Sequence, residues 1–91
     1  MAGIVAVIVK IMPDSPEEDL EKIKADAKVK LEEDGARNIS FEEEPVAFGL
    51  KAIKAKFAWD EDKEGEIYEK KLGEIAGVSS VDTVDYRRAF G

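Results

Sequence analysis

The sequence predicts an α/β (α+β) fold in which four antiparallel strands form one sheet and two helices cover one face of it. Six segments with strand or helix periodicity follow one another in the order strand, helix, strand, strand, helix, strand. The chain has 91 residues, which is enough for a single domain, residues 1–91, with one small core. It contains no linker, internal repeat or low-complexity segment that would divide it.

The first expected strand runs from Gly3 to Met12. Every second position carries a β-branched residue, which is typical of a strand face packed against a core. This face consists of Val5, Val7, Val9 and Ile11. The opposite face is also largely apolar, and it consists of Ile4, Ala6, Ile8 and Lys10. Because both faces are apolar, we expect this strand to lie in the centre of the sheet.

The first expected helix runs from Pro16 to Glu33. Its start is predicted from Ser15 as the N-cap, Pro16 at the first helical position and Glu18 completing a capping box. Apolar residues then recur at helical spacing, and the charged residues between them are expected to face water. Gly35 lies where a C-terminal cap belongs.

Two strands are expected in the middle of the chain. One runs from Arg37 to Glu42 and alternates apolar with polar residues, as a half-buried strand at the edge of a sheet does. The other runs from about Ala47 to Trp59. Its alternation slips near Lys51-Ala52, and we therefore expect a β-bulge there.

A second helix and a last strand complete the chain. The helix is expected to end at Gly77, and the strand is expected from Val78 to Ala89 because of its valine and threonine content. One face of the helix is marked by Tyr68, Leu72, Ile75 and Ala76. Right-handed crossovers fold this order of elements into a ferredoxin-like sandwich.

Both helices of such a sandwich cover the same face of the sheet, and the other face stays open. The open face of the first strand would carry Ile4, Ala6 and Ile8 beside Lys10. Two interpretations follow. Long neighbouring side chains shield these apolar groups, or the face is a contact surface for another molecule.

The composition excludes several classes of function. The chain has no cysteine and no histidine, which excludes disulfides, zinc fingers, haem ligation, thiol nucleophiles and histidine-based acid–base chemistry. Its net charge of −7 opposes direct binding to nucleic acid, because phosphate contacts need neutralising cations. No phosphate-binding loop or dinucleotide fingerprint is present, and we expect no cofactor.

Metal and membrane binding are also not expected. The acidic runs at 14–19, 42–44 and 60–62 are interpreted as solvated charge, and the first of them suits a helix N-terminus without any metal. The longest apolar run, Ile4 to Val9, is far shorter than the ~20 residues that a membrane span needs. No basic region opens the chain as in a signal peptide, and a cytoplasmic location is expected.

The content of charged and amide residues is typical of proteins from organisms that grow at high temperature. The chain contains no glutamine and one asparagine, Asn38, while 38% of its residues are charged, mostly Glu and Lys. This bias is a trend of hyperthermophile proteins, and we predict a thermophilic origin.

Three side chains are candidates for contact with a partner. Phe48 lies between Pro45 and Gly49 at the entry of a hairpin, where its ring either plugs the edge of the core or protrudes as a wedge. Arg87 and Arg88 are two of only three arginines and lie next to each other on a strand, so they are expected on opposite faces. Each either pairs with a nearby carboxylate or recognises phosphate or carboxylate on a partner.

Two segments, EPVAFGLK at 44–51 and GVSSVDTVDYRR at 77–88, together resemble the translation elongation factor 1-beta family in its short archaeal form. The similarity covers essentially the whole chain and includes the strand order, the Pro-x-x-Phe-Gly hairpin and the Ser-Val-Asp segment. The resemblance implies a guanine nucleotide exchange factor for the GTPase elongation factor 1-alpha. Such a factor is not an enzyme, because it neither breaks nor forms a covalent bond.

The same resemblance implies which residues contact the partner. In the family, a hairpin aromatic inserts into the GTPase, and this position falls on Phe48, followed by Gly49. A basic residue near the C-terminus is directed at the magnesium and phosphate region, and it falls on Arg88 where eukaryotic members have Lys. Arg88 could instead brace a loop carboxylate, with Arg87 as the second candidate.

The oligomeric state separates this function from its chief alternative. An exchange factor of this kind is expected to be a monomer. The alternative is a ferredoxin-like ligand-binding or oligomerising module that uses its open sheet face, and such a module is expected to be a dimer or larger.

Overall fold

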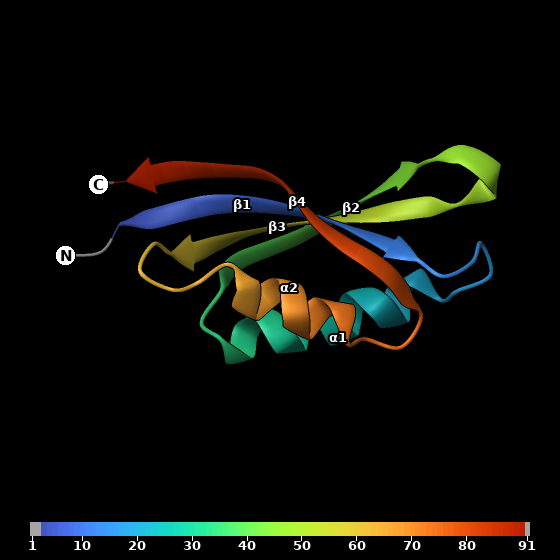
Figure 1. Ribbon diagram of the computed structural model, residues 1–91, viewed down its shortest axis with the longest axis horizontal. Helices are drawn as coiled ribbons and strands as arrows, with labels where there is room; N and C mark the ends of the chain where they lie inside the picture. Colours follow the sequence, from blue (N-terminus) through green and yellow to red (C-terminus); the bar gives the residue numbers. More distant parts are fainter. Residues whose placement is uncertain (1–2, 91) are drawn as a thin grey trace.

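Four antiparallel strands form one sheet in the order β2-β3-β1-β4 (Figure 1). The computed structural model describes residues 3–90. The elements are β1 (Ile4–Pro13), α1 (Leu20–Glu33), β2 (Arg37–Pro45), β3 (Lys51–Asp60), α2 (Glu66–Gly73) and β4 (Val78–Phe90). A short 3-10 turn, η1 (Ala47–Gly49), joins β2 to β3.

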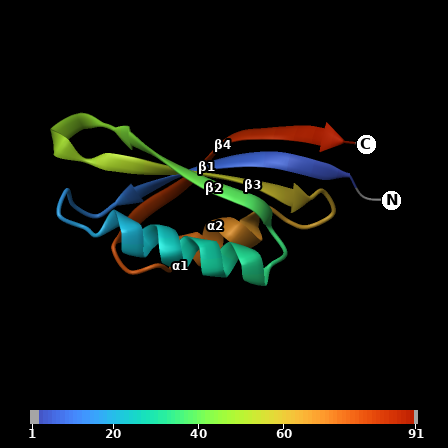
Figure 2. The same ribbon diagram turned by 180° about the vertical axis from the view of Figure 1, so that it is seen from behind.

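The order and pairing of the elements confirm the predicted ferredoxin-like sandwich. β1 lies between β3 and β4 in the centre of the sheet, and β2 lies at one edge, as expected. Both helices lie on the same side of the sheet and leave the other side open (Figures 1 and 2). The sandwich therefore has one covered and one open face, and it is elongated, with a longest dimension of 44 Å.

The core lies between the sheet and the helices. The odd-numbered residues of β1 from Val5 to Ile11 are all buried, as their alternation predicts. Three aromatic rings pack edge to face beneath the sheet: the centroids of Trp59 and Tyr68 are 5.1 Å apart, and those of Phe57 and Tyr68 are 5.2 Å apart. This geometry is favourable for aromatic pairs and fixes α2 against β3.

The start of α1 differs from the sequence prediction. The helix begins at Leu20, and its N-cap is Asp19, whose carboxylate accepts hydrogen bonds from the backbone N–H groups of Glu21 (3.1 Å) and Lys22 (3.3 Å). The hydroxyl of Ser15 accepts one bond, from the N–H of Glu17, within a turn that precedes the helix. Asp19 caps the helix because it satisfies two otherwise unpaired N–H groups.

The end of α1 confirms the predicted glycine cap. Gly35 has a φ of 87°, which is the left-handed conformation that favours glycine. Its N–H donates to the carbonyl of Glu32, and the N–H of Ala36 donates to the carbonyl of Leu31, both at 3.0 Å. These two bonds form a Schellman motif, which satisfies carbonyls at the end of the helix.

The hairpin between β2 and β3 has its turn further along the chain than predicted, and its one register shift lies between Arg37 and Ser40. β2 extends to Pro45, and β3 begins at Lys51 rather than at Ala47. The expected bulge at Lys51-Ala52 is absent, since Ala52 and Ile53 pair with β2 without a shift in register. Both are fully buried although they face opposite sides of the sheet, and this double burial explains the slip in the apolar alternation.

The second half of the chain differs from the prediction at the end of α2. The helix ends at Gly73 and not at Gly77, and a turn then carries Ile75, whose N–H donates to the carbonyl of Leu72. Ile75 is still buried, so the apolar face continues beyond the helix itself. β4 starts at Val78 as predicted and extends one residue beyond the expected end, to Phe90.

β4 has three irregularities in its pairing with β1, which the sequence did not indicate. Register shifts occur between Ile4 and Val5, between Ile8 and Val9, and between Met12 and Pro13. At each of them β4 contains one residue more than β1, as in a β-bulge.

The acidic run of β2 forms ion pairs instead of being simply solvated. Glu42 and Glu44 reach lysines of β3, at 2.9 Å from Lys56 and 2.7 Å from Lys54. Glu43 faces the helices and lies 2.7 Å from the ammonium of Lys24 on α1. Each hydrogen bond from a lysine stabilises the ionised carboxylate, and the pKa of all three carboxyl groups is lowered.

We expect these three carboxylates to make the stability of the fold depend on pH. A carboxyl group whose pKa is lower in the folded state stabilises the fold above its ordinary pKa of 4.5, and this contribution is lost as the pH falls through the folded pKa. The urea midpoint should therefore fall between pH 5 and pH 3. Urea titrations of the wild type and of a triple Glu→Gln variant at 42–44 test this, and an equal pH dependence in both would contradict it.

Candidate functional site

The hairpin tip presents one aromatic ring to solvent. Phe48 is 93% exposed, so its ring protrudes as a wedge and does not plug the core. Its φ is 63°, and that of the following Gly49 is 76°. A positive φ is costly for a bulky residue, about 1–3 kcal/mol, and such strain persists only where surrounding structure imposes it.

Backbone hydrogen bonds hold the tip in this conformation. The N–H of Val46 donates to the carbonyl of Leu50 at 2.8 Å, and the N–H of Leu50 donates back to the carbonyl of Ala47 at 3.3 Å. Gly49 tolerates its left-handed conformation without cost, and nothing lies within 4 Å of where its Cβ would be. The hairpin therefore displays Phe48 on a closed turn in open space.

The two candidate arginines lie near the other end of the sheet. Arg88 pairs with Val5 of β1 and Arg87 pairs with Ala6, so the two side chains lie on opposite faces, as predicted. Arg87 is on the open face, and its side chain is 80% exposed. Arg88 is on the face that carries the helices, and its side chain is 61% exposed.

Each arginine contacts a carboxylate of the chain. The Nε of Arg87 lies 3.1 Å from Asp85 on the same strand. Arg88 contacts Glu61, in the loop after β3, with two nitrogens: Nε donates to Oε2 at 3.0 Å and Nη2 donates to Oε1. These hydrogen bonds lower the pKa of Glu61 and raise that of Arg88.

The structure does not bring the hairpin and the arginines together. β3 runs from the hairpin at Lys51 to Asp60, and Asp60 pairs with Ile4 at the start of β1, where Arg88 also lies. Figure 1 shows the hairpin tip at one end of the molecule and the end of β4 at the other. The candidate residues therefore lie in two separate places, at opposite ends of the sheet.

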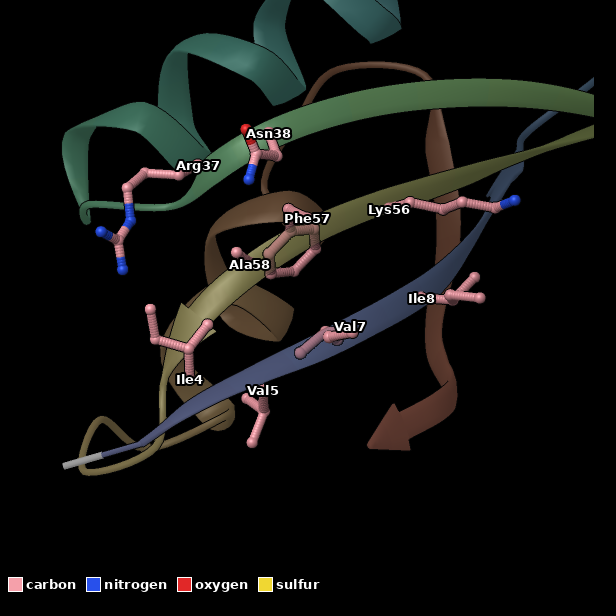
Figure 3. Close-up of a pocket in the computed structure, with 10 residues that line it drawn as sticks. Ile4, Val5, Val7, Ile8, Arg37, Asn38, Lys56, Phe57 and Ala58 are labelled. Atoms are coloured by element: carbon pink, nitrogen blue, oxygen red, sulfur yellow. The ribbon is translucent and has the colours of Figure 1, made fainter. Parts of the chain in front are cut away.

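The open face of the sheet has a shallow hollow of about 440 Å³. Its floor contains the expected apolar residues of β1, with Ile4 and Ile8 half-buried and Ala6 exposed. Figure 3 shows Arg37 and Asn38 of β2 at one side of the hollow and Lys56 of β3 at another. Whether this face is only shielded or contacts another molecule stays a prediction.

Sequence reasoning missed Glu61 and Arg37 as members of these surfaces. Glu61 was part of an acidic run interpreted as solvated charge, although the loop that carries it leaves the sheet beside the end of β4. Arg37 was placed only at the start of a strand, and it lies 3.3 Å from Asp60. Glu61 is distant in sequence from Arg88, and Arg37 is distant from Asp60. Only the register of the strands could have indicated these two pairs.

The described residues contain no cluster of potential metal ligands and no helix that could span a membrane. Residues 3–90 contain no group of three or more acidic side chains placed to hold a metal ion together. Within the same range, neither α1 nor α2 has the length and apolarity to cross a bilayer.

The chain is similar to one protein family over most of its length. The family model of the EF-1 guanine nucleotide exchange domain matches residues 6–88. The elongation factor 1-beta of Methanothermobacter thermautotrophicus is 37% identical over 87 residues, which cover 94% of this chain and 97% of the relative. That of Methanocaldococcus jannaschii is 43% identical over 86 residues, covering 93% and 96%. That of Methanoculleus marisnigri is 42% identical over 85 residues, covering 91% and 94%.

Proposed function

Because the chain belongs to the family of EF-1 guanine nucleotide exchange domains, we propose that it promotes GDP release from elongation factor 1-alpha and so allows GTP to be loaded. This proposal rests on the match of the family model to residues 6–88, a range that includes the hairpin, β4 as far as residue 88, and the two candidate arginines Arg87 and Arg88. The function needs neither covalent chemistry nor a bound cofactor, and it fits a cytoplasmic monomer that does not contact nucleic acid.

Exchange of this kind is a coupling between two binding equilibria. An exchange protein that prefers the nucleotide-free GTPase weakens the binding of nucleotide to the GTPase. By linkage, nucleotide weakens the binding of the exchange protein to the GTPase by the same ratio. Each tenfold effect corresponds to roughly 1.4 kcal/mol, so a thousandfold effect needs about 4 kcal/mol. A few well-placed side chains at an interface can supply this difference.

We propose that the two ends of the sheet contact two separate parts of the GTPase. Phe48 fits an apolar pocket, because its ring is exposed and the turn holds the backbone that carries it. Arg88 is directed at the magnesium and phosphate region, where its charge and planar group suit an oxyanion. The length of the molecule, 44 Å, is large enough to keep these two contacts apart.

Stopped-flow release of a fluorescent GDP analogue from elongation factor 1-alpha tests the function. The release rate in excess unlabelled GDP should rise with the concentration of this protein and reach a plateau. Calorimetry should show tighter binding to the nucleotide-free GTPase than to the GDP complex. An unchanged release rate, or equal affinity for both forms, would contradict the proposal.

A further inference from the structure

Glu61 holds the guanidinium group of Arg88 in one orientation. Its two carboxylate oxygens accept hydrogen bonds from Nε and Nη2 of Arg88, the first at 3.0 Å. A pair of parallel bonds of this kind fixes the plane of the guanidinium as well as its position. A single contact, such as that of a lysine, would leave the charged group free to rotate.

Glu61 is itself anchored to the fold. Its backbone N–H donates to the carbonyl of Gly3 at 2.9 Å, which ties the loop to the segment before β1. Two residues further on, the carbonyl of Lys63 accepts a hydrogen bond from Nε1 of the buried Trp59. The ammonium group of Lys63 also donates to the carbonyl of Asp34 at the end of α1. The carboxylate that orients Arg88 therefore stands on a loop fixed at three points.

The paired guanidinium keeps one edge available. An arginine has five N–H donors, and Glu61 uses two of them, so three remain on Nη1 and Nη2. These three make no hydrogen bond to another of the residues 3–90, and the side chain is 61% exposed. The edge formed by Nη1 and Nη2 adjoins the edge that is bonded to Glu61, at about 120° around the planar group, so Glu61 does not cover it.

We infer that Glu61 is a positioning residue for exchange: it orients Arg88 so that the free edge of the guanidinium meets an oxyanion of the GTPase. This inference rests on the proposed function. An arginine that is already oriented loses less side-chain freedom when the partner binds. The pair is exposed and adds little to the stability of the fold, so its main effect is on the orientation of Arg88.

The variant Glu61→Gln tests this inference through the maximal rate of GDP release at a saturating concentration of the protein. Glutamine keeps the shape of the side chain but replaces one acceptor by a donor group, so the paired geometry is lost. We expect the maximal rate to fall about three- to tenfold, the range for losing one pre-ordered side chain. The melting temperature should stay close to that of the wild type.

Two further variants separate positioning from a loss of charge or of structure. Asp62→Asn removes the same charge from the same loop at an exposed residue that forms no ion pair with residues 3–90, and it should leave the rate unchanged. In the background of Arg88→Ala, Glu61→Gln should have no additional effect, because there is no guanidinium left to orient.

Each outcome has a defined meaning. An unchanged or faster maximal rate for Glu61→Gln, with an active wild type, overturns the inference. A three- to tenfold loss that persists in the Arg88→Ala background, or an equal loss for Asp62→Asn, also overturns it. A wild-type protein that does not accelerate GDP release overturns the proposed function instead.

Discussion

Replacing Arg88 by alanine is expected to reduce the maximal rate of GDP release by about 30- to 140-fold. Truncating one partner of a charged contact at an interface costs about 2–3 kcal/mol, and each 1.4 kcal/mol corresponds to a factor of ten. The side chain is largely exposed and its ion pair with Glu61 lies at the surface, so the fold should remain intact. Stopped-flow release from elongation factor 1-alpha gives the rate, and thermal unfolding checks the fold.

Arg87→Ala is the matched control for this variant. It removes the same group from the neighbouring position, but Arg87 faces the open side of the sheet and contacts Asp85. An unchanged rate for Arg87→Ala beside a slow Arg88→Ala supports the assignment. A slower rate in Arg87→Ala alone would assign the contact with the GTPase to Arg87 instead of Arg88. Full activity of both variants would contradict a role of either arginine in exchange. Arg88→Lys should be intermediate, because an ammonium keeps the charge but not the planar geometry.

Phe48→Ala is expected to raise the concentration needed for half-maximal exchange by about 30- to 100-fold. Aromatic side chains that fill a pocket at an interface commonly contribute 2 kcal/mol or more, and the exposed ring has no role in the core that would explain its place. Because the ring is 93% exposed, its removal should not unfold the protein. The dependence of the release rate on protein concentration gives this value.

A second substitution and a control make this test specific. Phe48→Gly should show the same loss of exchange and a slightly higher melting temperature, because glycine adopts the positive φ without strain. Val29→Ala truncates another exposed apolar side chain, on α1, and should leave exchange unchanged. Equal effects of Phe48→Ala and Val29→Ala would contradict a specific contact of the ring.

The sequence predicts most of the fold because periodicity reports which face of an element is buried. The alternation from Val5 to Ile11 places β1 correctly, and Gly35 ends α1 where expected. The predicted start of α1 was wrong because Ser15 and Asp19 are both residues that favour the N-cap position. Only the directions of the free N–H groups decide between them, and these depend on where the chain enters the helix.

The positions of the individual candidate residues were predictable from the sequence, but their arrangement relative to one another was not. Alternation along β4 places Arg87 and Arg88 on opposite faces, and the structure agrees. The exposure of Phe48 depends on the conformation of a three-residue turn, which periodicity does not report. The pairing of Arg88 with Glu61 joins residues 27 positions apart, and it requires the register of β1 with both of its neighbours.

The three bulges of β4 also affect the tendency of the protein to aggregate at high concentration. β4 is an edge strand of 13 residues, and a long regular edge is a template on which other chains add strands and aggregate. Each bulge interrupts the row of N–H and C=O groups, so no long uninterrupted stretch is offered to a neighbour. The irregular β4 is therefore a poor template for strand addition, although it lies at an edge of the sheet.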